Sequence, residues 1–215
     1  MSQKASHIAD IRRDYRMAAL DEVMAGDDPL MLFTTWFSEA ETAEIEEVNA
    51  MVLATCDAEG KPHARIVLLK GLDAKGFIFF TNYHSAKGRE IAANPNASLV
   101  FFWKELERQV RIEGKIEQVT AAESDAYFRS RPAESRLGAW ASAQSSPISD
   151  RQVLEDNFHK YQQQFGEDIP RPDHWGGYRL VATRIEFWQG RSNRMHDRIR
   201  FNQTGNSWKK ERLAP

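Results

Sequence analysis

Hydrophobic residues recur at helical spacing in the first part of the chain, up to about residue 45. Two amphipathic helices are therefore expected there. The second is expected to start after Asp28-Pro29, because proline is favoured at the first position of a helix. The apolar positions of the first helix are Ile8, Ile11, Tyr15 and Ala18. Those of the second helix are Leu30, Phe33, Trp36 and Phe37.

The pattern changes at Asn49, where short runs rich in Val, Ile, Leu and Phe begin, several of them separated by turn-forming residues. The expected strands are Ala50–Cys56, Arg65–Lys70, Phe77–Thr81, Ser98–Trp103, Gln109–Gln118, Tyr178–Trp188, Arg198–Asn202 and Trp208–Leu213. A short helix is expected at Ser85–Ala93. Two later helices carry capping-box signatures, Thr120 with Glu123 and Ser149 with Gln152.

This order of elements predicts a mainly β protein with flanking helices, built on an antiparallel sheet of about seven or eight strands. A sheet of that size with few parallel crossover units is expected to curl into a barrel. No Gly-x-Gly-x-x-Gly follows a strand and no P-loop lysine motif is present, so neither nucleotide-binding signature applies.

Composition narrows the class of protein further. The 215 residues are 41% hydrophobic and 28% charged, as in an ordinary folded domain. A net charge of -2 gives no overall field for nucleic acid or an anionic membrane. The single cysteine, Cys56, cannot form an intramolecular disulfide. No apolar run is long enough to span a membrane, and no signal peptide is visible. We therefore expect a cytoplasmic protein without a metal site, nucleic-acid partner or membrane anchor.

Two cationic positions flank the apolar run Arg65–Lys70. Being five residues apart on a strand, Arg65 and Lys70 point to opposite faces. The run is either a core strand with solvated ends or a strand that serves one anion on each face. Farther on, Ser85 precedes Lys87 at a helix start, which suits phosphate but is by itself weak evidence.

Two further clusters are open to more than one interpretation. Tyr127 and Arg131 lie four residues apart on an expected helix, with Ser135 just after Pro132 ends it. They form either a phosphomonoester clamp or an exposed pair at a helix end. His196 lies among arginines that favour its neutral form, or it is an ordinary surface histidine.

Taken together, several motifs resemble the pyridoxine/pyridoxamine 5′-phosphate oxidase family, nearly end to end. The most specific is Arg194-x-His196-Asp197-Arg198. The others are Arg65–Lys70, Glu107-Arg108-Gln109-Val110, Ser130-Arg131-Pro132, Gly138-Ala139-Trp140, Gln144-Ser145-Ser146, Trp175-Gly176-Gly177 and Phe187-Trp188-Gln189-Gly190.

The resemblance implies a split β-barrel of the FMN-binding type, as a homodimer with FMN held between subunits. It implies a single domain over residues 1–215, in which residues 1–45 cover the site and residues 46–215 form the barrel with its peripheral helices. The implied reaction oxidises pyridoxine or pyridoxamine 5′-phosphate at C4′ to pyridoxal 5′-phosphate. The flavin accepts the hydride, and oxygen reoxidises it to give hydrogen peroxide.

The resemblance also implies roles for individual residues. The expected FMN contacts are Arg65, Ile66, Val67, Leu68, Phe80, Thr81, Lys87, Gln109, Gln144, Ser145, Trp188 and Arg198. The expected substrate contacts are Arg12, Tyr15, Lys70, Tyr127, Arg131, Ser135, Arg194 and His196. Arg194 and His196 are the expected catalytic pair.

One departure from the family pattern has an expected consequence. The family usually shows Arg-Lys where this chain has Ala86-Lys87. Loss of a charge-assisted hydrogen bond costs about 1.5–3 kcal/mol, so we expect weaker FMN retention. Two other functions remain open: a non-catalytic flavin or pyridoxal-phosphate binding protein, and a related split-barrel reductase that uses another substrate.

Overall fold

The computed structural model describes residues 14–215, and these divide into two compact units. The first unit contains the described N-terminal residues up to Val48 together with Val100–Arg111 and Arg184–Pro215. The second contains Asn49–Leu99 and Ile112–Thr183. The boundaries fall within strands, so the sheet contributes residues to both units. The expectation of a single domain over 1–215 stays a prediction.

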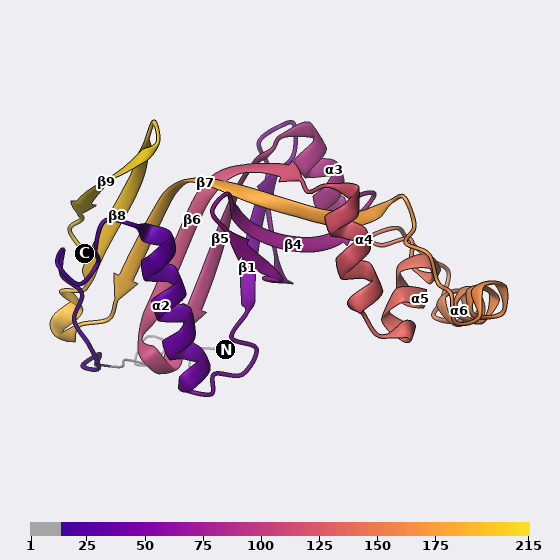
Figure 1. Cartoon of the computed structure of the whole chain (residues 1–215), viewed down its shortest axis with the longest axis horizontal. Helices are drawn as coiled ribbons and strands as arrows, with labels where there is room; N and C mark the ends of the chain where they lie inside the picture. The colour runs from indigo at the N-terminus through magenta and orange to yellow at the C-terminus, as the bar shows by residue number, and fades with distance from the viewer. Residues whose placement is uncertain (1–13) are drawn as a thin grey trace, which may run out of the picture. The chain divides into compact units, whose positions relative to one another are not determined.

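The described residues form a nine-stranded sheet in the order β2-β1-β5-β6-β7-β4-β3, with β8 pairing β7 and β9 pairing β8 (Figure 1). The pairs β1–β2, β3–β4, β4–β7, β7–β8 and β8–β9 are antiparallel. The strands are β1 Ala50–Cys56, β2 Pro62–Leu68, β3 Gly71–Asp73, β4 Gly76–Asn82, β5 Asn96–Trp103, β6 Arg108–Gln118, β7 Trp175–Gln189, β8 Asp197–Thr204 and β9 Ser207–Arg212. Flanking helices complete the expected split-barrel class, which is confirmed.

In the first unit, the helix α2 (Pro29–Thr42) buries an aromatic face. Asp28 caps it by accepting a hydrogen bond from the backbone N–H of Leu30, and proline occupies the first turn as expected. Phe33 contacts Phe101 edge to face at 5.1 Å, and Trp36 contacts Phe187 at 5.2 Å. These aromatic contacts hold the helix on the strands of its own unit.

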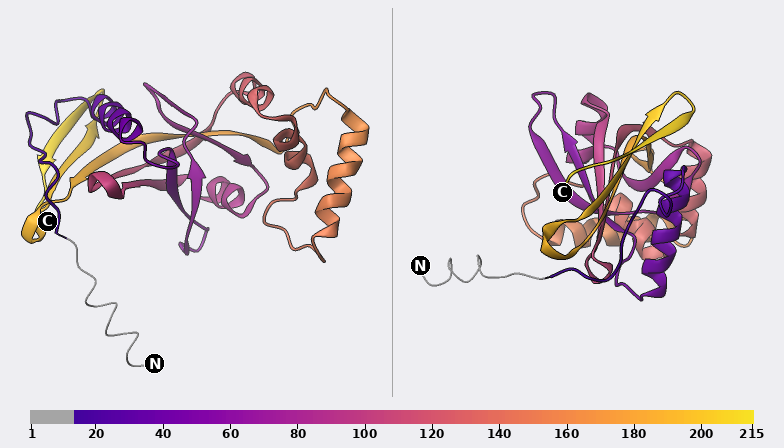
Figure 2. Two further views of the ribbon diagram at one scale, coloured as in Figure 1. Left: turned by 90° about the horizontal axis from the view of Figure 1, so that it is seen from below. Right: turned by 90° about the vertical axis from the view of Figure 1, so that its left-hand side faces the viewer.

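The second unit contains four helices beside its strands. They are α3 (Ala86–Ala93), α4 (Ala121–Ser130), α5 (Ala133–Ala141) and α6 (Gln152–Phe165). The last two lie side by side in the ribbon views (Figure 2). Phe128 of α4 and Leu137 of α5 form a buried cluster with Ile169 and Trp175, and α6 packs against it through Phe158, Tyr161 and Phe165. This cluster fixes the helical layer on which one wall of the candidate site depends.

Most expected elements are present, with definite exceptions. Ser85 caps α3, and the capping box of Thr120 with Glu123 is confirmed. The one proposed for Ser149 is wrong: α6 starts after Arg151, and the Ser149 hydroxyl bonds Asp150 instead. The three-residue β3 and the helix α5 were not expected from the sequence, and β2 ends at Leu68, so Lys70 follows the strand.

The expected first helix is wrong over its described part. Residues 14–20 are irregular and Glu22–Ala25 form turns. Ile8, Ile11 and Arg12 lie outside the described residues. Tyr15 and Ala18 therefore do not lie on a helix, although their spacing in the sequence is helical.

Among the described residues, none of the helices has the length and apolar character needed to cross a lipid bilayer. The cytoplasmic location stays a prediction.

Candidate active site

A basic pocket of about 320 Å³ lies in the second unit. Its cations are Lys70, Lys87 and Arg131, and its other polar residues are Thr81, Tyr127 and Gln144. Its apolar lining consists of Ile66, Val67, Leu68, Phe80 and Trp175. All but Trp175 were expected from the sequence to contact cofactor or substrate.

One wall of this pocket is a stack of aromatic rings. The Phe80 ring stacks on Tyr127 with centroids 4.0 Å apart and on Trp175 at 5.6 Å. Glycine at 177 makes room for this stack, since a Cβ there would stand 2.7 Å from Phe80 Cε1 and 2.6 Å from Val119 Cγ2. The Trp175-Gly176-Gly177 motif thus builds the wall, and its tryptophan could have been nominated from the motif alone.

Arg131 enters the pocket from the end of α4. It caps that helix with an extended backbone, so it does not share a helical face with Tyr127 as the spacing suggested. Its guanidinium lies over the Trp175 ring, 4.6 Å from the centroid. Its Nη1 is buried and has no hydrogen-bond partner among the described residues, and burial lowers the pKa of Arg131. A buried guanidinium donor without a protein partner can donate to an anionic ligand.

An adjoining pocket of about 330 Å³ shares Arg131, Gln144 and Trp175 with the first. Ser135 lines it from the first turns of α5, together with Asn82. Ser145 lines neither pocket but follows Gln144 in a left-handed backbone conformation, with φ of 69°. The expected phosphate clamp is therefore distributed over two adjoining hollows that meet at Arg131.

Lys87 is a buried cation at the start of α3, 8% exposed. Its Nζ donates to Thr81 Oγ1 at 3.4 Å, and among the described residues no carboxylate oxygen lies within ion-pair distance. Burial, and then the charge of Arg65, lower the pKa of Lys87. Thr81 in turn donates to Gln144 Oε1 at 3.2 Å, so Lys87 and Gln144 meet at one hydroxyl.

Arg65 does not line either pocket. Its guanidinium donates to Glu90 at 2.9 Å and to Thr55. Burial opposes ionisation of Glu90, but hydrogen bonds from Thr55 and Arg65 outweigh it and hold the pKa of Glu90 below its usual value. The expected role of Arg65 at the FMN phosphate stays a prediction, and Glu90 is a partner that the sequence gave no sign of.

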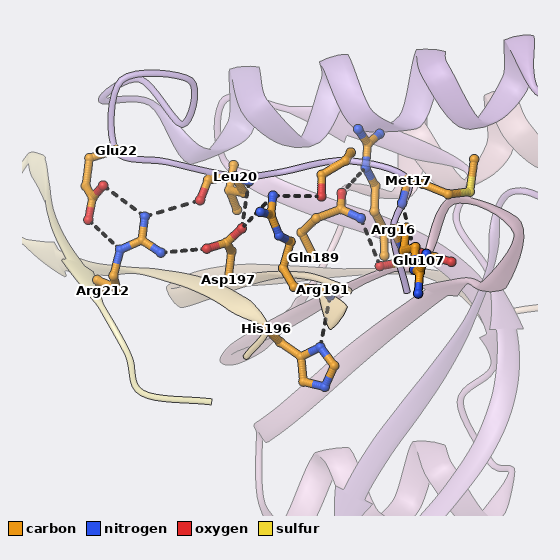
Figure 3. Close-up of polar contacts among 12 residues, drawn as sticks. Arg16, Met17, Leu20, Glu22, Glu107, Gln189, Arg191, His196, Asp197 and Arg212 are labelled. Atoms are coloured by element: carbon orange, nitrogen blue, oxygen red, sulfur yellow. Dashed lines mark hydrogen bonds and ion pairs between the residues drawn. The ribbon is translucent and has the colours of Figure 1, made fainter. Parts of the chain in front are cut away.

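A second group of expected site residues lies in the first unit, around His196. Trp188 and His196 have ring centroids 4.6 Å apart, and Tyr15 meets both edge-on, at 5.7 and 5.8 Å. His196 Nδ1 accepts the backbone N–H of Arg191 at 3.1 Å (Figure 3). The ring proton of the neutral form is therefore on Nε2, where it can be donated to a ligand.

The remaining members of that group differ in their contacts. Arg198 Nε donates to Glu186 at 2.8 Å, and Gln109 is partly buried on β6. Arg194 is exposed and follows Asn193, both with positive φ, 59° and 56°. Two left-handed non-glycine residues in a row are uncommon, and such backbone often marks a functional loop.

Comparison with known proteins places this fold among the split-barrel proteins of the pyridoxamine 5′-phosphate oxidase type. A family model described as pyridoxamine 5′-phosphate oxidase matches residues 37–165, and a pyridoxine 5′-phosphate oxidase C-terminal dimerisation region matches residues 175–215. The chain belongs to the pyridoxine/pyridoxamine 5′-phosphate oxidase family. It is thus an oxidoreductase of an FMN-dependent family, as expected.

Similar proteins span nearly the whole chain. A pyridoxine/pyridoxamine 5′-phosphate oxidase of Cupriavidus necator is 57% identical over 211 residues, covering 98% of this chain and all of that protein. One of Thermosynechococcus vestitus is 56% identical over 210 residues, with the same coverage. The structure of PhzG from Burkholderia lata, in complex with tetrahydrophenazine-1-carboxylic acid, matches with a TM-score of 0.87 and 31% identity over 93% of this chain and 99% of that one. A related FMN-binding protein from Nostoc punctiforme, 16% identical with a TM-score of 0.71, covers 88% of this chain and all of that one and shows the shared fold.

The residues of the pocket fit FMN. The phosphate of FMN is a dianion, and the buried Lys87, which has no carboxylate oxygen within ion-pair distance among the described residues, would contribute one positive charge to it. The isoalloxazine ring is large and apolar, and exposed Ile66 and Leu68 of β2 offer it a surface. The donor set thus suits a flavin phosphate at one end and a ring along the strand.

Proposed function

We propose that this protein oxidises pyridoxine or pyridoxamine 5′-phosphate to pyridoxal 5′-phosphate, with oxygen as acceptor and hydrogen peroxide as product. The observation that carries the proposal is the buried, unpartnered Nη1 of Arg131 in a pocket that also holds Lys70 and Tyr127. A protein that only binds FMN does not need a second phosphate site formed by Lys70, Tyr127 and Arg131. FMN supplies the two-electron acceptor when bound.

The chain's own residues orient the substrate. Lys70, Tyr127, Arg131 and Ser135 hold its phosphate, which fixes one end of the molecule. His196, with its proton on Nε2, donates to the phenolic oxygen of the pyridine ring. Arg194 covers the ring face that points away from the flavin. The active form is a homodimer with FMN at the interface, supported by the match of residues 175–215 to a dimerisation region.

The two other candidate functions predict different chemistry. A binding protein retains the vitamer unchanged, and a reductase of another substrate gains nothing from the vitamer's phosphate. PhzG shares the fold at 31% identity, whereas the relatives from Cupriavidus necator and Thermosynechococcus vestitus, at 57% and 56% identity, carry the oxidase name. The phosphate clamp therefore favours the oxidase function.

Stoichiometry tests the proposal directly. With reconstituted protein and pyridoxine 5′-phosphate, we expect one oxygen consumed and one peroxide formed for each pyridoxal 5′-phosphate, because the two electrons removed at C4′ must reach an acceptor. An oxygen electrode, a peroxide assay and product absorbance measure the three quantities. Product formed without oxygen uptake would exclude oxygen as the acceptor, and no product at all would exclude the oxidase.

The protonation of His196 gives a pH prediction. Burial, and then the charge of Arg194, lower the pKa of His196 below its ordinary value of 6.5. Above the lowered pKa the ring is neutral and accepts the Arg191 N–H; below it, Nδ1 gains a proton and cannot accept. We expect the His196 ring to titrate below pH 6.5 in an NMR titration of the free protein, with His196→Gln identifying its signal. NMR is preferred to an activity profile because a substrate phosphate itself titrates near pH ~6. A midpoint at or above pH 6.5 would contradict the neutral role.

Ala86 provides a gain-of-affinity prediction. It is partly exposed at the start of α3, beside buried Lys87, so an arginine there can be accommodated. We expect Ala86→Arg to tighten FMN binding about tenfold, from one added charge-assisted hydrogen bond. Fluorescence titration of apoprotein with FMN measures this. Ala92→Arg adds the same charge on an exposed position of the same helix and is expected to leave affinity nearly unchanged. Equal effects of the two variants would mean that general charge, not a contact at position 86, is responsible.

A further inference from the structure

Glu107 is a buried carboxylate at an unusual position in the first unit. It is 3% exposed and has a left-handed backbone, with φ of 55°, where it ends the short 3-10 helix η1 (Lys104–Leu106). Its Oε2 accepts the backbone N–H of Arg16 at 2.8 Å and of Met17 at 3.1 Å (Figure 3). The side chain therefore holds the N-terminal segment 14–28 by its backbone, at a site 90 residues away in the chain.

The turn that presents Glu107 is itself fixed by the motif before His196. Gln189 is fully buried, and its Nε2 donates to the carbonyls of Leu106 and Glu107 at 3.1 and 3.2 Å. Its Oε1 accepts from Arg108 Nε at 2.9 Å. The N–H of Gly190 donates to the Glu107 carbonyl at 2.7 Å. These bonds fix the backbone of the turn from which the Glu107 side chain projects.

Tyr15 is the residue that this arrangement places. It immediately precedes the two N–H groups bound by Glu107, and its ring meets Trp188 and His196. Glycine at 190 provides the space: a Cβ there would stand 2.8 Å from Tyr15 Cγ and 3.0 Å from Glu107 Cβ. Tyr15, Glu107 and Gly190 thus form one close-packed contact beside the imidazole.

Asp197 anchors the other end of the segment. Its Oδ2 accepts the N–H of Leu20 at 3.1 Å, and its Oδ1 accepts from Arg212 at 2.9 Å. Arg212 also binds Glu22, a bond that lowers the pKa of Glu22 to about 2. Arg191 donates to the Ala18 carbonyl at 3.3 Å. The second anchor is therefore the residue next to His196, and the segment is held on both sides of Ala18.

We propose that Glu107 is a positioning residue for the oxidation. By binding the N–H groups of Arg16 and Met17, it sets Tyr15 against His196 and Trp188, so the ring-binding end of the site is complete only when the segment is docked. Glu107 touches neither substrate nor cofactor in this account. The expected effect of Glu107 on turnover rests on the proposed function. Its expected effect on docking of the segment 14–28 does not.

Docking is tested without cofactor or substrate. The Arg16–Met17 bond is a trypsin site whose arginine side chain is 80% exposed but whose backbone is held by Glu107. We expect Glu107→Ala to speed its cleavage about tenfold or more, since local opening governs proteolysis. Mass spectrometry of the released peptide measures the rate. Glu107→Gln keeps an oxygen acceptor, so its cleavage rate is expected to lie between those of the wild type and Glu107→Ala. Exposed Glu105→Ala removes a carboxylate two residues away and is expected to match the wild type.

Positioning is tested by a double-mutant cycle with Tyr15. We expect Glu107→Ala to lower kcat/KM for pyridoxine 5′-phosphate about tenfold in the wild type, and to have almost no further effect in Tyr15→Ala. FMN affinity, measured by fluorescence, is expected to stay unchanged. Additive effects, or a cleavage rate equal to the wild type, would overturn the proposal. If no variant oxidises the vitamer, the proposed function fails while the cleavage result still decides whether Glu107 docks the segment. Should Glu107→Ala fail to fold, the cleavage rate and the double-mutant cycle are measured with Glu107→Gln instead.

Discussion

Arg131→Ala is expected to lower kcat/KM for pyridoxine 5′-phosphate by roughly 10- to 100-fold, mainly through KM. Removing a charged hydrogen-bond donor from a buried phosphate site costs about 1.5–3 kcal/mol. Arg131 is held in place by its stack on Trp175, 4.6 Å from the ring centroid, so its donors are already oriented before substrate arrives. Steady-state kinetics with the purified, FMN-loaded protein measures the effect.

Two variants make the Arg131 result specific. Arg129→Ala removes the same charge from an exposed position on the same helix and is expected to be nearly neutral. Arg131→Lys keeps the charge but loses the planar stack, so an intermediate KM is expected. A KM for Arg131→Ala within about twofold of the wild type would remove this residue from the phosphate site.

Arg194→Ala is expected to lower the rate of flavin reduction by about 100-fold while FMN affinity stays close to the wild type. The reason is orientation: a misplacement of about 1 Å at the reacting carbon costs on the order of 100-fold in rate. Arg194 is exposed, and its side chain makes no hydrogen bond or ion pair among the described residues, so its removal breaks no such bond; it does remove the charge that helps to lower the pKa of His196. Stopped-flow reduction under anaerobic conditions isolates this step.

Met195 supplies the matched control for Arg194. It is the next residue, 67% exposed, and Met195→Ala is expected to leave the reduction rate nearly unchanged. An unchanged rate for Arg194→Ala would rule out its proposed role over the ring. A loss of FMN in that variant would instead assign Arg194 to cofactor binding.

Elements whose signals are local could be predicted from the sequence. β1 has the bounds that its apolar run indicated, and Thr120 with Glu123 forms the capping box that their spacing indicated. β3 has three residues and was not expected, because so short a strand has no alternation of its own. The N-terminal segment is irregular because distant carboxylates, Glu107 and Asp197, bind its N–H groups. No local pattern encodes such partners.

The candidate site also has residues that could be predicted and residues that could not. Ten of the expected residues line one pocket, and the resemblance to the family supplied that set where spacing alone left two interpretations. Trp175 was missed as a ligand wall although its motif was noted. Glu90 was missed because its contact with Arg65 joins residues 25 apart on a helix and a strand. Ion pairs of this kind depend on tertiary placement, which composition and periodicity do not encode.

The most direct test of FMN-dependent oxidation is a spectrum taken without oxygen. Protein reconstituted with FMN is expected to show flavin absorption bands that bleach when pyridoxamine or pyridoxine 5′-phosphate is added, and that return when oxygen is admitted. Unphosphorylated pyridoxine, which cannot use the clamp around Arg131, is expected to bleach them far more slowly. Flavin bands that persist with the phosphorylated vitamers would contradict the proposed function.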